Sequence, residues 1–225
     1  MSVSELLIIV PTRGRPQVIA DLWNSFETTS REAATLLLAV DNDDPLLLEY
    51  VKVAATYNIQ VTVGQRLRLG GTLNEVALQE ADNYPYIGFM GDDHRPRSAG
   101  WDVEYVEALK SNLFVYGNDL LQKENLPTQV AMRSSVVKTL GYMSPPGLVH
   151  MFIDNAWKAW GDGTGSIKYL PDVVVEHLHP AAGKASEDSN YQEVWKLMEP
   201  DSVKWREYSE TDALSSDIHK LKGLL

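Results

Sequence analysis

The chain has 225 residues, of which 44% are hydrophobic and 23% charged, as in an ordinary folded protein with a sizeable core. It contains no cysteine, which excludes disulfides and thiolate metal sites and leaves oxygen and imidazole ligands, suited to magnesium or manganese. The net charge of −11 argues against a protein that wraps nucleic acid, because phosphate binding depends on lysine and arginine.

The first half of the chain alternates apolar runs with helical patterns. The apolar runs predict strands at residues 6–10, 35–40, 59–63 and 86–90. Apolar residues at helical spacing predict helices at residues 16–27, 46–57 and 72–82. We interpret Gly70 and Gly71 as a break before the last of these helices. Strands that alternate with helices predict an α/β fold with a mainly parallel sheet flanked by helices.

The second half of the chain is less regular. We predict strands at residues 113–116 and 129–132, helices at 134–140 and 151–160, and a strand within 167–179. Four side chains in that last strand share one face by period two: Val173, Val175, His177 and His179.

The segment from Glu187 onward is polar, with sparse apolar anchors at Trp195, Leu197 and Trp205. We therefore divide the chain into a main domain, residues 1–185, and a helical C-terminal tail, residues 186–225. The tail is expected to pack on the body or to form a homodimer interface, with an end that is partly disordered. No apolar run reaches the length of a membrane span, and the N-terminus lacks the basic region of a signal peptide, so we expect a cytoplasmic protein.

Polar clusters follow three of the predicted strands directly, at residues 12–15, 41–44 and 92–94. The carboxyl ends of parallel strands meet at one edge of a sheet, and ligands bind beyond that edge. The sequence therefore predicts that the three clusters converge on one functional rim.

Asp92 and Asp93 are adjacent carboxylates that repel each other unless a cation compensates. A hard divalent metal that bridges to phosphate oxygens is the natural partner, and the alternative is a solvated turn. His177 and His179 are candidates for further metal ligands. Their alternative role is that of hydrogen-bonded strand histidines.

The first two clusters offer nucleotide contacts. Asp41 ends a predicted strand, where a carboxylate either accepts hydrogen bonds from a base or ribose or closes a turn. For Asp43 and Asp44 the turn or helix N-cap is the preferred interpretation. Arg13 and Arg15 suit phosphate or base recognition, although a surface ion pair is preferred for Arg15.

Asp154 lies beside Phe152 and Ile153 at the start of a predicted helix. A carboxyl group in apolar surroundings has a raised pKa and can act as a general base, and the alternative is a charge that complements the helix dipole. Lys184, next to Gly183, either contacts a diphosphate from a loop or is an exposed lysine.

The order of these motifs resembles the GT-A class of glycosyltransferases, particularly the inverting family 2 group, over residues 6–185. The resemblance implies a GT-A, nucleotide-diphospho-sugar transferase-like fold. It also implies which residues bind the nucleotide-sugar donor: Pro11, Thr12, Arg13, Asp41, Gly71, Asn74, Asp92 and Lys184.

The same resemblance implies a metal-binding D-x-D motif, which here is altered to Gly-Asp-Asp-His at residues 91–94. Either Asp93 binds the metal with Asp92 assisting, or Asp92 and His94 share the task. A downstream histidine, His177 or His179, completes the implied site.

The implied reaction is an inverting transfer of a sugar from a UDP- or GDP-sugar to an acceptor hydroxyl, with manganese or magnesium. Asp154 aligns with the acceptor base, although the usual preceding acid is absent. The acceptor is a protein, a glycan or a modified nucleobase. The alternatives are a sugar nucleotidyltransferase, for which the first loop is poor in glycine, and a catalytically silent nucleotide-sugar-binding module.

Overall fold

The computed structural model describes residues 4–184 and 189–225. In these residues eight strands form a curled sheet in the order β3-β2-β1-β4-β7-β6-β8-β5. The strands agree with the predicted ones, apart from the additional short strand β5. Their bounds are β1 Leu6–Thr12, β2 Ala34–Asp41, β3 Gln60–Gly64, β4 Tyr86–Phe89, β5 His94–Pro96, β6 Phe114–Asn118, β7 Val130–Arg133 and β8 Ile167–His177.

The sheet is parallel in its N-terminal half and mixed beyond it. The β1–β2, β1–β4, β2–β3 and β6–β8 pairs are parallel, whereas β4–β7, β6–β7 and β5–β8 are antiparallel. Only a 3-10 turn lies between β6 and β7, so no crossover helix returns the chain, and these strands run antiparallel. Two antiparallel steps separate β4 from β6, so β6 and β8 point the same way as β1, β2 and β4. Their carboxyl ends meet at one edge.

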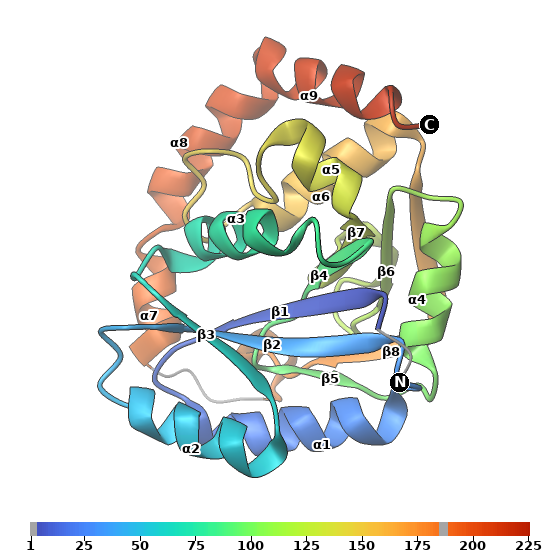
Figure 1. Cartoon of the computed structure of the whole chain (residues 1–225). Helices are drawn as coiled ribbons and strands as arrows, with labels where there is room; N and C mark the ends of the chain where they lie inside the picture. The colour runs from blue at the N-terminus through green and yellow to red at the C-terminus, as the bar shows by residue number, and fades with distance from the viewer. Residues whose placement is uncertain (1–3, 185–188) are drawn as a thin grey trace.

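Helices cover both faces of the sheet (Figure 1). One face carries α1 (Ile19–Thr29), α2 (Leu47–Tyr57) and α4 (Trp101–Leu109), and the other carries α3 (Arg68–Glu80), α5 (Ser134–Leu140) and α6 (Ile153–Thr164). Alternate β1 side chains supply the two cores: Leu6, Ile8 and Val10 face the first set of helices, and Leu7 and Ile9 face the second. All five are fully buried, as expected for a strand covered on both faces.

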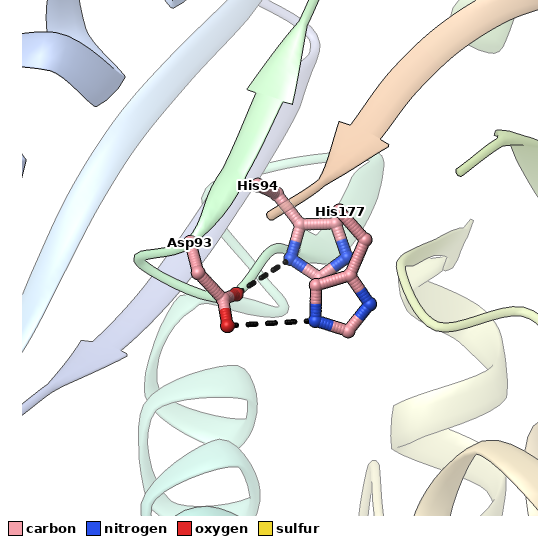
Figure 2. A group of neighbouring side chains, drawn as sticks. All are labelled: Asp93, His94 and His177. Atoms are coloured by element: carbon pink, nitrogen blue, oxygen red, sulfur yellow. Dashed lines mark ion pairs between the residues drawn. The ribbon is translucent and has the colours of Figure 1, made fainter. Parts of the chain in front are cut away.

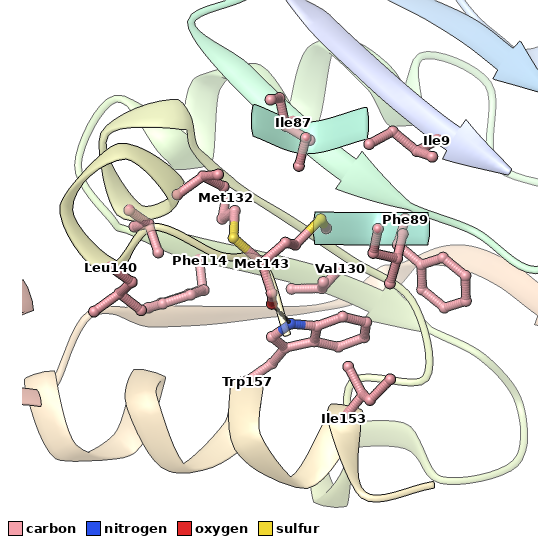
Figure 3. Close-up of a cluster of buried hydrophobic side chains, with 14 of the residues drawn as sticks. Ile9, Ile87, Phe89, Phe114, Val130, Met132, Leu140, Met143, Ile153 and Trp157 are labelled. Atoms are coloured by element: carbon pink, nitrogen blue, oxygen red, sulfur yellow. Dashed lines mark hydrogen bonds between the residues drawn. The ribbon is translucent and has the colours of Figure 1, made fainter. Parts of the chain in front are cut away.

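Figure 3 shows the core beneath α6. The Trp157 side chain is almost completely buried between Phe89 and the α5 region, and its Nε1 donates a hydrogen bond of 2.7 Å to the Met143 carbonyl oxygen. Burying an indole costs less free energy when its N–H finds an acceptor. This contact therefore fixes the rotation of α6, and with it the direction of the first turn of that helix.

The C-terminal segment forms α7 (Ser189–Trp195), α8 (Met198–Ser209) and α9 (Asp212–Lys222). Leu221 of α9 is fully buried in the core that contains Trp157, and Trp205 packs against that core. The Asp217 carboxylate accepts hydrogen bonds from the hydroxyls of Tyr142 and Tyr208. The described end of the chain is thus the helix α9, which packs on the body. The predicted boundary between residues 185 and 186 lies outside the described residues.

Gly70 and Gly71 do not break the chain, because α3 begins at Arg68 and includes both. A Cβ atom on Gly70 would lie 2.2 Å from the Leu148 carbonyl oxygen. The glycine therefore allows close packing of α3 against the loop before α6, which outweighs its poor helix propensity. None of the helices in the described part of the chain combines the length and apolar character needed to cross a membrane.

Candidate functional site

A cavity of about 330 Å³ opens at the carboxyl edge of the sheet. All three polar clusters predicted to converge contribute to its wall, together with residues from α6 and β8. The sequence-predicted residues that line it are Pro11, Thr12, Arg13, Arg15, Asp41, Asp92, Asp93, His94, Asp154, His177 and His179. The strand ends thus meet at one rim, and the cavity size is that of a small-molecule site.

Asp93, His94 and His177 form a compact group of potential metal ligands, with one atom from each within 4.8 Å of the others. The Oδ1 atom of Asp93 lies 3.3 Å from His94 Nδ1, and Oδ2 lies 3.4 Å from His177 Nε2 (Figure 2). The two imidazoles come together because His94 of β5 pairs in register with His177 of β8, and their ring centroids are 4.2 Å apart. Two imidazoles and a carboxylate suit a divalent metal such as manganese.

The hydrogen bonds around His94 leave its Nδ1 without a proton. This atom accepts a bond of 3.1 Å from the Gly91 N–H, and Nε2 lies 3.5 Å from the Thr128 hydroxyl. That hydroxyl donates to Asp119, so it can only accept from Nε2. Burial lowers the pKa of His94 to about 4, and the ring is neutral at neutral pH. Nδ1 and Asp93 Oδ1 are then two acceptors face to face, an arrangement that a cation between them stabilises.

One further feature of the group favours a cation. Burial raises the pKa of Asp93, but the contact with His177 opposes this, and the pKa lies well below its usual range, so the carboxylate is ionised. A Cβ atom on Gly91 would lie 2.6 Å from Asp93 Oδ1, so only glycine leaves room for this carboxylate.

Asp92 faces away from that group. Its Oδ2 accepts a hydrogen bond of 2.7 Å from the Thr12 hydroxyl, and its Oδ1 lies 3.4 Å from Arg15. Burial raises the pKa of Asp92 to about 6. Arg95, which the sequence analysis did not select, holds the turn in shape by donating to the carbonyl oxygens of Asp92 and His94 at 2.8 and 2.7 Å. The two adjacent aspartates therefore point to different neighbours.

Arg13 links the first predicted polar cluster, to which it belongs, to the second. Its Nη1 lies 3.0 Å from Asp41 Oδ2 and 2.5 Å from Asp43 Oδ1. Burial raises the pKa of Asp41. Asp44 instead accepts a bond of 2.8 Å from the Leu46 N–H, which fits the turn preferred for it, whereas the N-cap of α2 is Leu46. Arg13 and Asp41 thus offer a donor and acceptor pair at the cavity wall.

Asp154 lies in the first turn of α6 and lines the cavity. Burial raises the pKa of its carboxyl group to about 6, against the opposing effect of a hydrogen bond from the Asn155 N–H at 2.9 Å. A carboxyl group with that pKa is mostly ionised at neutral pH and basic enough to accept a proton. The geometry is thus compatible with the predicted general base, and the helix-dipole contact is made as well.

Two predicted residues, Lys184 and Gly71, lie outside the described cavity wall, and His179 lines the cavity but does not belong to the metal group. His179 is beyond the end of β8, so the predicted strand face does not reach it; it lines the cavity and contacts the His177 ring, but is outside the three-residue group. Lys184 pairs with Glu176 at 2.8 Å and is not part of the described cavity wall. Gly71 is also outside that wall, and a Cβ atom there would meet Leu67.

Asn74 holds a loop and does not line the described cavity. Its Oδ1 accepts bonds from the N–H groups of Met143 and Ser144 at 2.8 and 2.7 Å, and its Nδ2 donates to the Ser144 carbonyl at 2.9 Å. We expect Asn74→Ala to lower the free energy of unfolding by about 1–3 kcal/mol, because it strips partners from buried backbone groups. Urea denaturation measures this loss. A ligand role for Asn74 would instead appear as weaker nucleotide binding at unchanged stability.

Four ionisable residues of the cavity wall were missed by the sequence analysis: Arg66, Arg68, His150 and Glu193. Arg66 and Arg68 follow β3, so the rule that selected the other strand ends applies to them as well. Burial lowers the pKa of His150 to about 4. Its backbone N–H donates to Asp201 of α8 at 2.7 Å, which ties the loop before α6 to the tail. Glu193 reaches the cavity from α7, a contact that no local pattern indicates.

No protein-family model matches the chain, and no curated protein matches it in sequence. Solved structures do match its fold. The mannosyltransferase PcManGT from Pyrobaculum calidifontis, in complex with GDP-Man and Mn2+, aligns with a TM-score of 0.62 and 12% identity over 99% of this chain and 70% of that chain. Glucosyl-3-phosphoglycerate synthase from Mycobacterium tuberculosis, with Mn2+, UDP and glucosyl-3-phosphoglycerate, aligns at 0.56 and 10% over 88% and 80%.

S. aureus TarS 1-349 in complex with UDP aligns with a TM-score of 0.59 and 14% identity over 76% of this chain and 59% of that chain. The present chain therefore spans about three fifths of the length of that structure. Together these similarities show a GT-A-like fold of the nucleotide-diphospho-sugar transferase type, and the predicted fold class is confirmed.

Proposed function

We propose that this chain is a metal-dependent glycosyltransferase that moves a sugar from a nucleoside-diphosphate-sugar to an acceptor hydroxyl. The observation that carries the proposal is the Asp93, His94 and His177 group at the carboxyl edge of the sheet, in a cavity that also contains arginines. The fold adds support, since solved structures of similar fold contain UDP, GDP-Man and Mn2+.

The donor nucleoside would lie against the ends of β1 and β2. Pro11 and Thr12 supply one wall there, and Asp41 with Arg13 supplies an acceptor and a donor for the polar edge of a base or ribose. Arg15 lines the same cavity, 3.4 Å from Asp92, and suits contact with a phosphate.

Asp93, His94 and His177 would hold manganese or magnesium. When bound, the metal would stabilise the negative charge of the leaving diphosphate, together with the cavity arginines. Asp92 would orient Thr12 and Arg15 on the nucleotide side, and His179 stands next to His177 as a further contact.

Asp154 would accept the proton of the attacking acceptor hydroxyl. Its raised pKa and its position on the cavity wall support this role. Attack from the side opposite the leaving diphosphate would invert the anomeric carbon.

The direct test is to incubate the protein with manganese and a panel of UDP- and GDP-sugars and to measure released nucleoside diphosphate, with water and with candidate glycan, protein and nucleobase acceptors. Manganese-dependent release supports the proposal. Pyrophosphate release from a nucleoside triphosphate and sugar phosphate would indicate a nucleotidyltransferase instead. Tight binding without turnover would indicate a binding module.

A further inference from the structure

A carboxylate from the C-terminal tail occupies two arginines of the cavity. Glu193 of α7 places Oε2 at 2.8 Å from Arg66 Nη2 and Oε1 at 2.8 Å from Arg68 Nη2. Arg66 follows β3, and Arg68 opens α3 with a φ of +63°, in the left-handed region that non-glycine residues rarely adopt. The two guanidinium groups thus converge on one anion.

The arrangement is the one that arginines adopt toward phosphate: planar donors that meet two oxygens of the same acceptor. The neighbouring Val194 and Trp195 also line the cavity, so α7 forms part of its wall. The hydrogen bond from Arg68 is the main cause that holds the pKa of Glu193 at about 2. The carboxylate therefore remains ionised throughout the range in which the protein would work.

The other acids that pair with cavity arginines belong to the sheet rim. Asp41 is the last residue of β2, Asp43 lies in the turn that follows it, and Asp92 lies in the turn after β4, so the strand ends carry all three. Glu193 is carried instead by the short helix α7, and Trp195 in the same helix is 47% exposed. Its two ion pairs are also partly exposed, and such pairs contribute little free energy. An incoming anion can therefore replace the Glu193 carboxylate at small cost.

The geometry points to a gate: Glu193 closes α7 over the cavity by occupying Arg66 and Arg68, and the diphosphate of an incoming nucleotide displaces it. This inference rests on the proposed function, because it takes a nucleoside diphosphate as the displacing anion. Donor binding and opening of α7 then favour each other, because both require the ion pairs of Glu193 with Arg66 and Arg68 to be broken.

The test is the affinity of Glu193→Gln for UDP and GDP in the presence of manganese, measured by titration calorimetry. We expect nucleoside diphosphate to bind Glu193→Gln about three- to tenfold more tightly than it binds the unmodified protein, because the competing carboxylate is gone. Glu199→Gln makes the same charge change at an exposed position in α8 and should leave the affinity unchanged. Equal or weaker binding by Glu193→Gln overturns the gate.

Hydrogen exchange of the α7 amides gives a second measurement. Glu193→Gln should speed their exchange without any ligand, and nucleotide should speed it in the unmodified protein. If neither protein binds nucleotide, the proposed function fails, and inorganic pyrophosphate then decides the gate. Tighter pyrophosphate binding by Glu193→Gln supports it, whereas equal binding, or none by either protein, overturns it.

Discussion

Asp154→Asn is expected to lower the rate of sugar transfer by about 10²- to 10⁴-fold, the usual contribution of a positioned general base. Asparagine keeps the shape of the side chain and its place at the start of α6, but it cannot accept a proton. Binding of nucleoside diphosphate with manganese should therefore stay within about twofold of the unmodified protein. Steady-state kinetics and calorimetry on the same preparations separate the two effects.

Asp162→Asn is the matched control for this variant. Asp162 lies on the same helix, pairs with Lys158 at 2.6 Å and does not line the described cavity, so its replacement should leave transfer unchanged. The assignment of Asp154 is lost if Asp154→Asn retains full transfer activity.

The pH dependence follows from the same carboxyl group. Because burial raises its pKa to about 6, the transfer rate should rise as pH increases through about 6, where Asp154 becomes ionised. Between the ordinary carboxyl pKa and about 6, Asp154 binds more protons in the folded state than in the unfolded state. Its contribution to the stability of the folded protein therefore falls as pH rises through that window. Asp154→Asn should consequently be at least as stable as the unmodified protein at about pH 8.

Asp93→Asn is expected to weaken manganese binding by at least about 100-fold, because it removes the carboxylate that faces both imidazoles. Asp92→Asn is its matched control. Asparagine at residue 92 keeps an acceptor for the Thr12 hydroxyl and leaves the three-residue group intact, so manganese affinity should change by less than about threefold. Electron paramagnetic resonance of free manganese measures both affinities directly.

The pair of variants decides between the two arrangements that the altered D-x-D motif left open. Comparable losses in both variants would contradict the grouping of Asp93 with His94 and His177. Near-UV circular dichroism of each variant checks that the fold is retained, so that a loss of metal is not mistaken for unfolding.

The convergence of the three polar clusters on one edge of the sheet was predictable, because it follows from local sequence pattern and sheet topology. Apolar runs that stop at Thr12, Asp41 and Asp92 predict strands, and parallel strands bring their ends to one edge. Burial of the Asp154 carboxyl group was predictable for a similar reason, since its apolar neighbours Phe152 and Ile153 are visible in the sequence.

The metal group was predictable only in part. That His94 belongs to it depends on the register between β5 and β8, which sets His94 opposite His177. A three-residue strand carries no periodicity of its own, so no local pattern shows this pairing. The same register explains why His179, two residues further along, falls outside the group.

Other contacts depend on tertiary packing between distant segments. Asn74 follows a glycine pair that matches a donor-binding motif, yet its amide holds the loop at Met143 and Ser144. Glu193 reaches Arg66 across 127 positions of the chain. In both cases the side chain has the chemistry that a sequence reveals, but its partner is set by how helices pack on the sheet.

The central claim is that a nucleotide binds here through a metal held by Asp93, His94 and His177. Titration calorimetry of UDP and GDP, with manganese and then with a chelator, tests it most directly. We expect at least one nucleotide to bind with manganese and its affinity to fall by at least about tenfold when the metal is removed. Binding of neither nucleotide, or equal affinity with and without manganese, would contradict the claim.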